Sequence, residues 1–207
     1  MFMPTRDLEY RLREEGYTAI VGIDEAGRGA WAGPLYAGAV ILDDAGAEVL
    51  SGIVKDSKAM TVHQRDNAYN AIVANALAWG VGFSSHDEID TLGLTRANQL
   101  AAERALQQLT QPYDYVILDG RLTVSFDIPQ QSIIDGDAKC LSIAAASIIA
   151  KVSRDRVMRE CHEQYPEYGF DTHVGYGTRE HQTALNTYGA CPLHRKSYAP
   201  IRALLSL

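Results

Sequence analysis

Three short apolar runs in this chain, each with the composition of a β-strand, stop at acidic residues. The runs cover residues 17–23 (YTAIVGI), 113–118 (YDYVIL) and 132–134 (SII). Stretches with helical periodicity or helix-capping signals separate them, so strands and helices alternate along the chain. This alternation predicts an α/β domain, in which functional side chains collect at the strand ends of a central sheet.

Other segments fill in the α/β pattern. Residues 35–42 and 79–83 have strand composition, and capping boxes that begin at Thr61 and Ser85 predict two helix starts. We expect helices over residues 5–15, 61–77, 85–93, 95–109, 140–163 and 178–187. No repeat, low-complexity tract or linker interrupts the chain, so we expect one domain over residues 1–207.

The acidic residues that follow the three runs are the strongest chemical signal. They are Asp24 with Glu25, then Asp119, and finally Asp137 with Asp135 beside it. Carboxylates gathered at one sheet edge repel one another unless divalent cations lie between them, and Mg²⁺ and Mn²⁺ prefer oxygen ligands. A single acidic residue at a strand end is commonly a turn former or a helix cap, but three such ends together favour a two-metal site for phosphoryl transfer.

A glycine-rich segment directly after the first acidic pair is the second signal. It reads AGRGAWAGP over residues 26–34, with two glycines that flank an arginine. The spacing formally fits the dinucleotide-binding fingerprint, but Pro34 and a strand-like run follow where that fingerprint requires a helix. Gly27 and Gly29 instead indicate a loop whose backbone approaches a phosphate or a sugar hydroxyl, although an ordinary turn has the same composition.

Several motifs, taken together and in order, resemble the signature of bacterial ribonuclease HII. They are GIDEAGRG at 22–29, KDSK at 55–58, LDG at 118–120, GDAK at 136–139, SIAAASIIAKV at 142–152, RD at 154–155, GYGT at 175–178, EH at 180–181 and HR at 194–195. The resemblance extends over residues 17–202. It implies a ribonuclease H-like fold, with a central mixed sheet flanked by helices and a helical C-terminal extension. The related ribonuclease HIII class carries a lysine where this chain has Arg28.

The resemblance also implies an activity. The family consists of endonucleases that hydrolyse the RNA strand of RNA–DNA hybrids and cut on the 5′ side of single ribonucleotides embedded in duplex DNA. The products carry a 3′-hydroxyl and a 5′-phosphate, and the implied process is ribonucleotide excision in DNA replication and repair. The implied cofactor is Mg²⁺ or Mn²⁺ at a two-metal site. The family's four catalytic, metal-binding carboxylates match Asp24, Glu25, Asp119 and Asp137, whereas Asp135 has no counterpart.

The implied substrate-binding residues are Gly27, Arg28, Gly29, Ser57, Lys58 and Tyr176. The glycine–arginine–glycine loop is the family's reader of the ribose 2′-hydroxyl, which is the group that distinguishes RNA from DNA. Tyr176 matches a tyrosine that packs on the neighbouring sugar. Asp155 is a candidate for supporting the metal ligands from behind, and His181 and His194 are expected to be structural.

Charge is distributed unevenly along the chain. The formal net charge of −7 argues against a nucleic-acid partner held by bulk positive charge. Residues 1–138 carry 10 Lys and Arg against 20 Asp and Glu, whereas residues 139–207 carry 9 against 6. We therefore expect the more basic, helical C-terminal region to contact duplex. Ala59 and Val174 stand where the family commonly has lysine, so we expect weaker phosphate contacts.

The sequence also bounds the cellular setting. It contains no apolar run of 18 residues, no signal-peptide pattern, and no CxxC spacing among its three cysteines. We therefore expect a cytoplasmic protein that is a monomer and has no membrane partner. The expected partners are RNA–DNA hybrids and ribonucleotide-containing duplex DNA, and the sequence identifies no protein partner.

Two other functions fit part of this pattern. Another ribonuclease H-like metal nuclease, such as a resolvase or an integrase, would share the carboxylates but would not need a loop that reads a 2′-hydroxyl. A non-catalytic module that binds hybrids would not need the intact carboxylates. Incision of a duplex that contains one ribonucleotide separates the three hypotheses.

Overall fold

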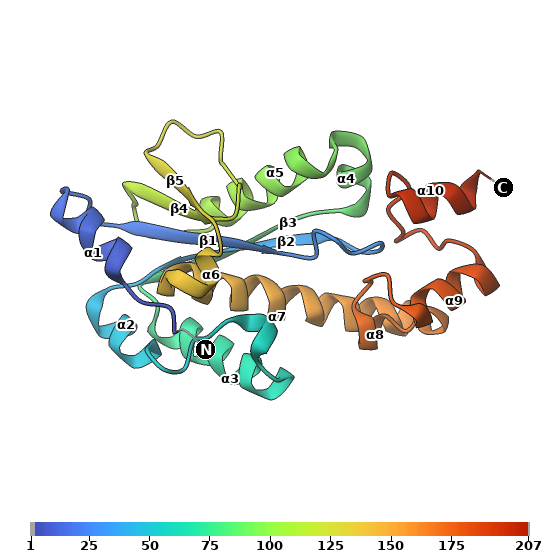
Figure 1. Ribbon diagram of the computed structural model, residues 1–207, viewed down its shortest axis with the longest axis horizontal. Helices are drawn as coiled ribbons and strands as arrows, with labels where there is room; N and C mark the ends of the chain where they lie inside the picture. Colours follow the sequence, from blue (N-terminus) through green and yellow to red (C-terminus); the bar gives the residue numbers. More distant parts are fainter. Residues whose placement is uncertain (1–2, 207) are drawn as a thin grey trace.

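The computed structural model describes residues 3–206, and its centre is a five-stranded mixed sheet (Figure 1). The strands are β1 (Ile20–Ala26), β2 (Leu35–Ile41), β3 (Ala78–Ser84), β4 (Tyr115–Asp119) and β5 (Gln130–Ile133). They lie in the order β3-β2-β1-β4-β5. Strand β2 runs antiparallel to both β1 and β3, whereas β4 runs parallel to both β1 and β5. The expected α/β class with a mixed sheet is therefore confirmed.

The helices of the described residues include every segment that the sequence predicted as helical. The α-helices are α1 (Asp7–Glu14), α2 (Asp44–Leu50), α3 (Val62–Asn75), α4 (His86–Leu92), α5 (Leu94–Gln107), α6 (Gly136–Lys139), α7 (Leu141–Gln164), α8 (Phe170–His173), α9 (Arg179–Tyr188) and α10 (Ala199–Leu205). Two short 3₁₀ helices are η1 (Ser57–Ala59) and η2 (Pro166–Tyr168). Both predicted capping boxes form, at Thr61 and at Ser85. The sequence did not predict α2, α6, α8 and α10, because four to seven residues are too few to show a helical period.

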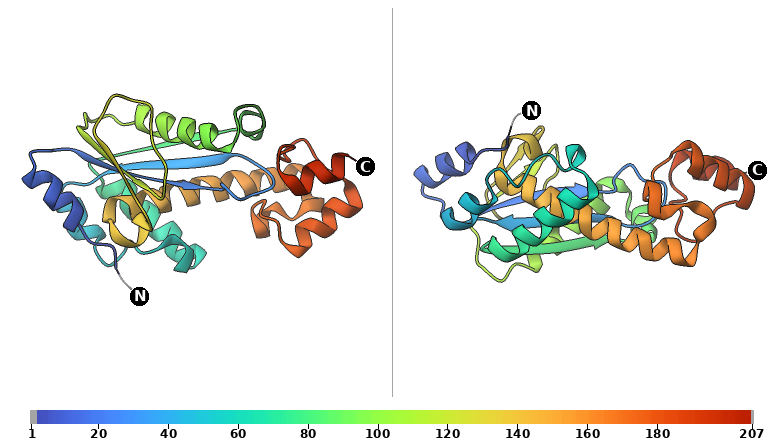
Figure 2. Two further views of the ribbon diagram at one scale, coloured as in Figure 1. Left: turned by 45° about the horizontal axis from the view of Figure 1, so that its top comes forward. Right: turned by 90° about the horizontal axis from the view of Figure 1, so that it is seen from below.

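Helices cover both faces of the sheet (Figures 1 and 2). Helix α5 packs on β2 and β3 from one side, and α7 packs on β1 and β2 from the other, with α3 and α2 outside it. Two glycines allow α7 to lie against the sheet. A Cβ atom on Gly38 would come within 2.3 Å of the Ala146 carbonyl oxygen, and one on Gly22 within 2.3 Å of the Ser142 carbonyl carbon. Any side chain at either position would push α7 away from the strands.

Helix α7 is long enough to leave the sheet and enter the C-terminal region (Figure 2). Around its C-terminal half, η2, α8, α9 and α10 build a separate apolar cluster that includes Met158, Phe170, Leu185 and Ile201. One continuous helix therefore connects the strands that carry the acidic residues to the C-terminal helices. No helix within residues 3–206 is long and apolar enough to cross a membrane.

The first acidic pair lies differently from what the sequence predicted. We expected the first strand to stop at Asp24 and Glu25, but β1 continues through both residues to Ala26. The reason is its neighbour: β2 extends far enough for Glu25 to pair with Ala37 and Ala26 with Tyr36. Both acidic residues therefore belong to a paired strand and not to a loop.

Candidate active site

The four predicted carboxylates come from three neighbouring elements. Asp24 and Glu25 lie near the end of β1, and Asp119 is the last residue of β4. These strands are parallel neighbours, with Ile23 opposite Leu118, so Asp24 and Asp119 lie side by side at one edge of the sheet. The chain then reaches α6, which carries the fourth carboxylate and whose first residue donates its backbone N–H to Asp119 Oδ1 at 2.6 Å.

Strand geometry divides the first acidic pair between the two sides of the sheet. Successive side chains of a strand point to opposite faces. Asp24 therefore lies on the α7 side, where burial raises its pKa and the nearby hydroxyl of Ser147 partly opposes that shift. Glu25 lies on the α5 side, where burial raises its pKa and the nearby side chain of Asn98 partly opposes that shift. Two adjacent residues thus reach the same edge from the two layers of the fold.

The electrostatics of this group are unfavourable without a cation. Burial raises the pKa of Asp24 well above its ordinary value, and the negative charges of Glu25 and Asp119 raise it further. Burial and the charge of Asp137 likewise raise the pKa of Asp119. A buried group of carboxylates with raised pKa values is stabilised by any bound positive charge.

One positive charge is already present, on Lys58. Its Nζ lies 3.1 Å from Asp137 Oδ2. Burial lowers the pKa of Lys58, but the hydrogen bond and the charge of Asp137, together with the charge of Asp24, outweigh it and raise the pKa overall. The lysine ammonium therefore neutralises part of the carboxylate group.

The donor set fits magnesium or manganese bound together with a substrate. All four ligands offer only oxygen atoms, which are the ligands that both ions prefer. Among residues 3–206, no three His, Cys, Asp or Glu side chains form a ready-made cage for one ion. Mg²⁺ commonly takes only one or two carboxylates and completes its shell with water and substrate phosphate, so an open arrangement of this kind suits it.

A cleft of about 220 Å³ brings most of the predicted residues together. Its lining consists of Asp24, Glu25, Ala26, Gly27, Arg28, Gly29, Ser57, Lys58, Asp119, Ser147, Lys151 and Tyr176. Three of the four carboxylates, the whole glycine–arginine–glycine loop and Tyr176 therefore face one space. The sheet, α7 and the C-terminal region thus bring together residues that are up to about 150 positions apart in the sequence.

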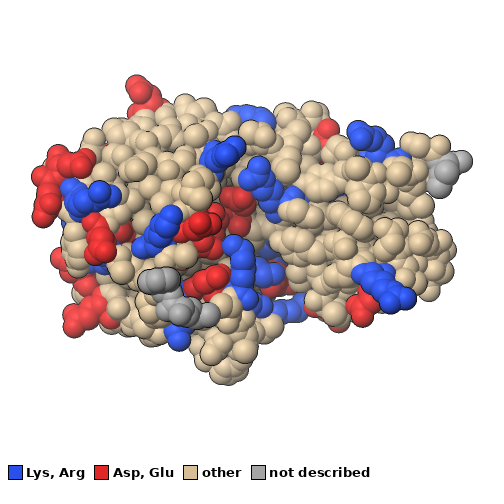
Figure 3. All heavy atoms as spheres, viewed as in Figure 1, with Lys and Arg blue, Asp and Glu red and all other residues tan. Residues whose placement is uncertain are grey.

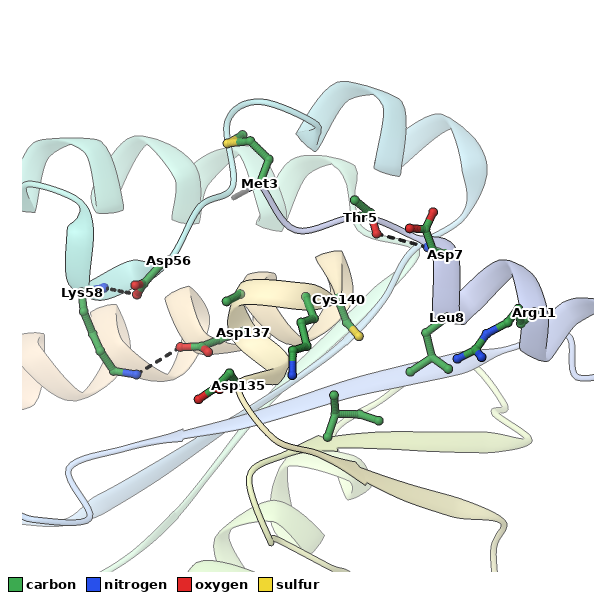
Figure 4. Close-up of a pocket in the computed structure, with 13 residues that line it drawn as sticks. Met3, Thr5, Asp7, Leu8, Arg11, Asp56, Lys58, Asp135, Asp137 and Cys140 are labelled. Carbon is green, nitrogen blue, oxygen red and sulfur yellow. Dashed lines mark hydrogen bonds and ion pairs between the residues drawn. The ribbon is translucent and has the colours of Figure 1, made fainter. Parts of the chain in front are cut away.

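A second, larger hollow of about 810 Å³ begins on the other side of the Lys58–Asp137 pair (Figure 4). Lys58 and Asp137 point toward each other there, and the hollow continues between α6 and the segment that leads into α1. Asp135 lines this outer hollow. It is exposed, starts α6 with a left-handed backbone (φ 54°), and does not line the carboxylate cleft. Its position agrees with its omission from the predicted ligand set.

The glycine loop and Tyr176 are supported from below by Arg154 of α7. Gly27 has φ 90°, and a Cβ atom there would lie 1.9 Å from Arg154 Nε, so only glycine fits this position. The Arg154 guanidinium donates to the carbonyl oxygens of Pro34, Ala32 and Val174 at 2.9, 3.2 and 2.9 Å. Its Cζ lies 5.5 Å from the centroid of the Tyr176 ring. One buried side chain thus holds the loop and the tyrosine turn at a fixed separation.

Of the other predicted residues, Ser57 lines the cleft and Asp155 does not. Ser57 is buried and its hydroxyl lies 3.0 Å from the hydroxyl of Ser147, beside Asp24. Asp155 does not line the cleft; its Oδ1 accepts a hydrogen bond of 2.7 Å from Nζ of Lys151, which does. Asp155 therefore orients a lysine and does not contact the carboxylates.

Sequence reasoning missed Asn98, Ser147 and Lys151 as members of the site. Ser147 and Lys151 belong to the SIAAASIIAKV motif at 142–152, from which no site residue was predicted, and Asn98 lies within the predicted helix over 95–109. Ser147 and Lys151 are four residues apart and therefore lie on one face of the helix, a spacing that the sequence shows. No signal in the sequence marked Asn98.

A mixed sheet with carboxylates at the adjoining ends of two parallel strands, and with helices on both faces, defines a ribonuclease H-like enzyme. The sequence model of the family described as ribonuclease HII matches residues 21–201. The chain belongs to the ribonuclease HII family, and it is a ribonuclease H-type endoribonuclease that acts on RNA–DNA hybrids. The resemblance noted in the sequence is thereby confirmed.

Individual relatives agree. Ribonuclease HII of Cupriavidus necator is 47% identical over 190 residues, which cover 90% of this chain and 79% of the relative. Ribonuclease HII of Chloroflexus aurantiacus is 45% identical over 209 residues and covers 99% and 98% of the two chains. The crystal structure of ribonuclease H2 from Pyrococcus horikoshii superposes with a TM-score of 0.78 at 26% identity, over 91% of this chain and 98% of that one.

Proposed function

We propose that this enzyme cuts the phosphodiester bond on the 5′ side of ribonucleotides, both in RNA–DNA hybrids and at single ribonucleotides in duplex DNA. The observation that carries the proposal is the shared cleft, in which metal-binding carboxylates, the glycine loop and Tyr176 face one another. A nuclease that ignored the sugar would need only the carboxylates. The products are a 3′-hydroxyl and a 5′-phosphate.

The carboxylates of Asp24, Glu25, Asp119 and Asp137 are the proposed ligands. Two Mg²⁺ or Mn²⁺ ions held there would supply Lewis-acid chemistry, which activates a water and stabilises a leaving 3′-oxygen. Ser147 lies beside Asp24 and Asn98 lies beside Glu25, on opposite sides of the sheet. Lys58 would contact a substrate phosphate, and this would free the carboxylate of Asp137, with which the lysine pairs at 3.1 Å.

The glycine–arginine–glycine loop and Tyr176 are the proposed sugar-reading surface. Gly29 is exposed, and a Cβ atom there would lie 3.9 Å from Cε1 of the tyrosine ring. The backbone of the loop at Gly29 and the Tyr176 ring therefore border the same part of the cleft. Backbone N–H and C=O groups in such a loop recognise a 2′-hydroxyl, which is a donor and an acceptor at once.

The surface charge supports a nucleic-acid substrate despite the negative total. Figure 3 shows Lys and Arg bordering the hollow between the sheet and the C-terminal helices, with acidic atoms at its floor. On the face that Figure 3 shows, other acidic side chains gather at the opposite end of the sheet, at the left. Local basic borders attract phosphates, while bound cations neutralise the acidic floor. We propose that the enzyme works as a monomer in the cytoplasm, in the repair and replication of DNA.

The direct test is incision of a labelled duplex that contains one ribonucleotide, in Mg²⁺ and in Mn²⁺, beside an all-DNA duplex and a four-way junction. We expect one cut, on the 5′ side of the ribonucleotide, and none in the other two substrates. Cutting of the junction would favour a resolvase. Binding without any cut would favour a non-catalytic module. Cleavage by the Asp24→Asn variant at the wild-type rate would contradict the proposed metal site.

A further inference from the structure

Arg195 is a fully buried cation without an acidic partner. Its side chain is 0% exposed, and within residues 3–206 no carboxylate lies in ion-pair distance of its guanidinium. Burial lowers its pKa, and the nearby Tyr198 opposes that shift. Burying a cation without an ionic partner costs free energy, and the hydrogen bonds of this guanidinium to neutral acceptors offset part of that cost.

Those contacts converge on the glycine loop. Arg195 Nε donates to the carbonyl oxygen of Gly33 at 3.0 Å, and Nη1 donates to that of Arg28 at 3.1 Å. Nη1 also donates to the Tyr198 hydroxyl at 2.9 Å, and that hydroxyl donates in turn to the same Arg28 oxygen at 2.5 Å. The Arg28 carbonyl therefore accepts two hydrogen bonds from the C-terminal region, across about 170 residues of chain.

The direction of this carbonyl fixes the direction of a second group. The carbonyl of Arg28 and the N–H of Gly29 belong to one planar peptide unit, in which the two bonds point in opposite directions. Holding the oxygen toward Arg195 and Tyr198 therefore turns the Gly29 N–H away from them. Gly29 lines the carboxylate cleft, and its N–H has no acceptor among the described residues.

We infer that Arg195 and Tyr198 are positioning residues for ribonucleotide recognition: they hold the Arg28–Gly29 peptide so that its N–H stays free and directed at the substrate sugar. The inference rests on the proposed function, because it concerns how the same cleft selects ribose. The donated hydrogen bond goes to the oxygen of the 2′-hydroxyl. A deoxyribose has no oxygen at this position, so the Gly29 N–H stabilises binding of the ribonucleotide only.

The segment that carries both residues is itself fixed to the sheet domain. Asp90 of α4 accepts hydrogen bonds from the backbone N–H groups of Lys196 and Ser197, at 2.8 and 2.9 Å. The Ser197 hydroxyl bonds to the same carboxylate. The turn from Arg195 to Tyr198 is closed by a backbone hydrogen bond of 3.1 Å. A turn anchored on two sides is rigid enough to set the orientation of a peptide unit.

The test compares Tyr198→Phe with a matched control. Phenylalanine keeps the ring and removes only the hydroxyl that bonds to Arg28. The control is Tyr188→Phe, also in the C-terminal region, at a tyrosine whose hydroxyl makes no hydrogen bond within residues 3–206. Binding is measured with the metal chelated, so that nothing is cut, on duplexes that differ only in one 2′-hydroxyl. The measured quantity is the ratio of the two dissociation constants.

We expect Tyr198→Phe to lower the preference for the ribonucleotide about fivefold, the effect of one hydrogen bond, with unchanged affinity for the all-DNA duplex. Tyr188→Phe should keep the wild-type ratio. Arg195→Lys should lower the preference further, with a thermal midpoint recorded to confirm folding. An unchanged ratio in Tyr198→Phe, or an equal loss on both duplexes, overturns the inference. Failure of wild-type enzyme to prefer or cut the ribonucleotide would instead overturn the proposed function.

Discussion

His181 and His194 share a hydrogen bond between their Nε2 atoms, which lie 2.9 Å apart in the buried layer below the Tyr176 turn. His181 Nδ1 donates to the carbonyl oxygen of Tyr176 at 3.0 Å, and the Cys191 N–H donates to His194 Nδ1 at 2.9 Å. These partners assign the shared proton to His194 and leave His181 Nε2 as the acceptor. The expectation that both histidines are structural agrees with this arrangement, which requires two neutral rings.

Acid should therefore destabilise the C-terminal region. Burial lowers the pKa of His181 and of His194 to about 4, from an ordinary value of 6.5. Between these values the two histidines bind protons in the unfolded chain but stay neutral in the folded chain. The free energy of unfolding therefore falls as the pH falls from 6.5 toward 4. We expect the thermal midpoint to be at least roughly 2–4 °C lower at pH 5 than at pH 7. In His194→Gln this difference should shrink; a parallel decrease in variant and wild type would contradict the assignment.

Two glycines of the recognition loop should respond differently to alanine. Gly27→Ala places a methyl group into Arg154 at a positive φ, and we expect it to cost more than about 2 kcal/mol of folding free energy. Gly29→Ala meets no atom closer than 3.9 Å, so its thermal midpoint should stay within about 2 °C of wild type. Its methyl group faces Tyr176, however, and cleavage at a ribonucleotide should fall more than about tenfold. Equal stability of the two variants would contradict the role of Arg154.

Asp24→Asn should stabilise the metal-free protein while it abolishes cleavage. The pKa of Asp24 is raised in the folded state, so its charge reduces stability once the pH rises through that value. Removing the charge should raise the thermal midpoint at pH 7 by roughly 2–4 °C or more, and lower the cleavage rate more than about a hundredfold. Mg²⁺ should raise the midpoint of wild type but much less that of the variant. A destabilised variant would show that the carboxylate is not under electrostatic strain.

Val174→Lys should strengthen the salt dependence of substrate binding. Val174 caps α8 with a left-handed backbone (φ 44°), an unfavourable conformation for a β-branched residue, so lysine should not reduce stability. A lysine next to the Tyr176 turn adds one phosphate contact, which steepens the slope of log affinity against log salt by about one. The measurement is the affinity for duplex at salt concentrations from about 50 to 200 mM, a range over which the slope can be determined. An unchanged slope would place residue 174 away from the phosphates.

The parts of the fold and site that sequence predicts are those with local causes. The capping boxes at Thr61 and Ser85 depend on residues three positions apart, and both formed. Asp119 at the end of β4 follows from strand composition alone, whereas Asp137, which we expected at the end of a strand, lies in α6. The end of β1 was placed too early because it depends on β2, whose pairing the sequence does not reveal. Arg195 and Asn98 could not be assigned for the same reason, since their partners lie on distant elements.

Helix α7 has a consequence for where the enzyme cuts. Ser147 of this helix lies beside Asp24 in the cleft, and Arg154 of the same helix packs under Gly27 and Tyr176. Seven residues separate the two, which is two helical turns, or about 10 Å. In the proposed function, two turns of one helix therefore fix the distance between the carboxylate group and the loop that reads the sugar. One residue inserted between them would rotate Arg154 by about 100° away from the loop, so in the proposed function the length of this helix segment would set the offset between the recognised nucleotide and the bond that is broken.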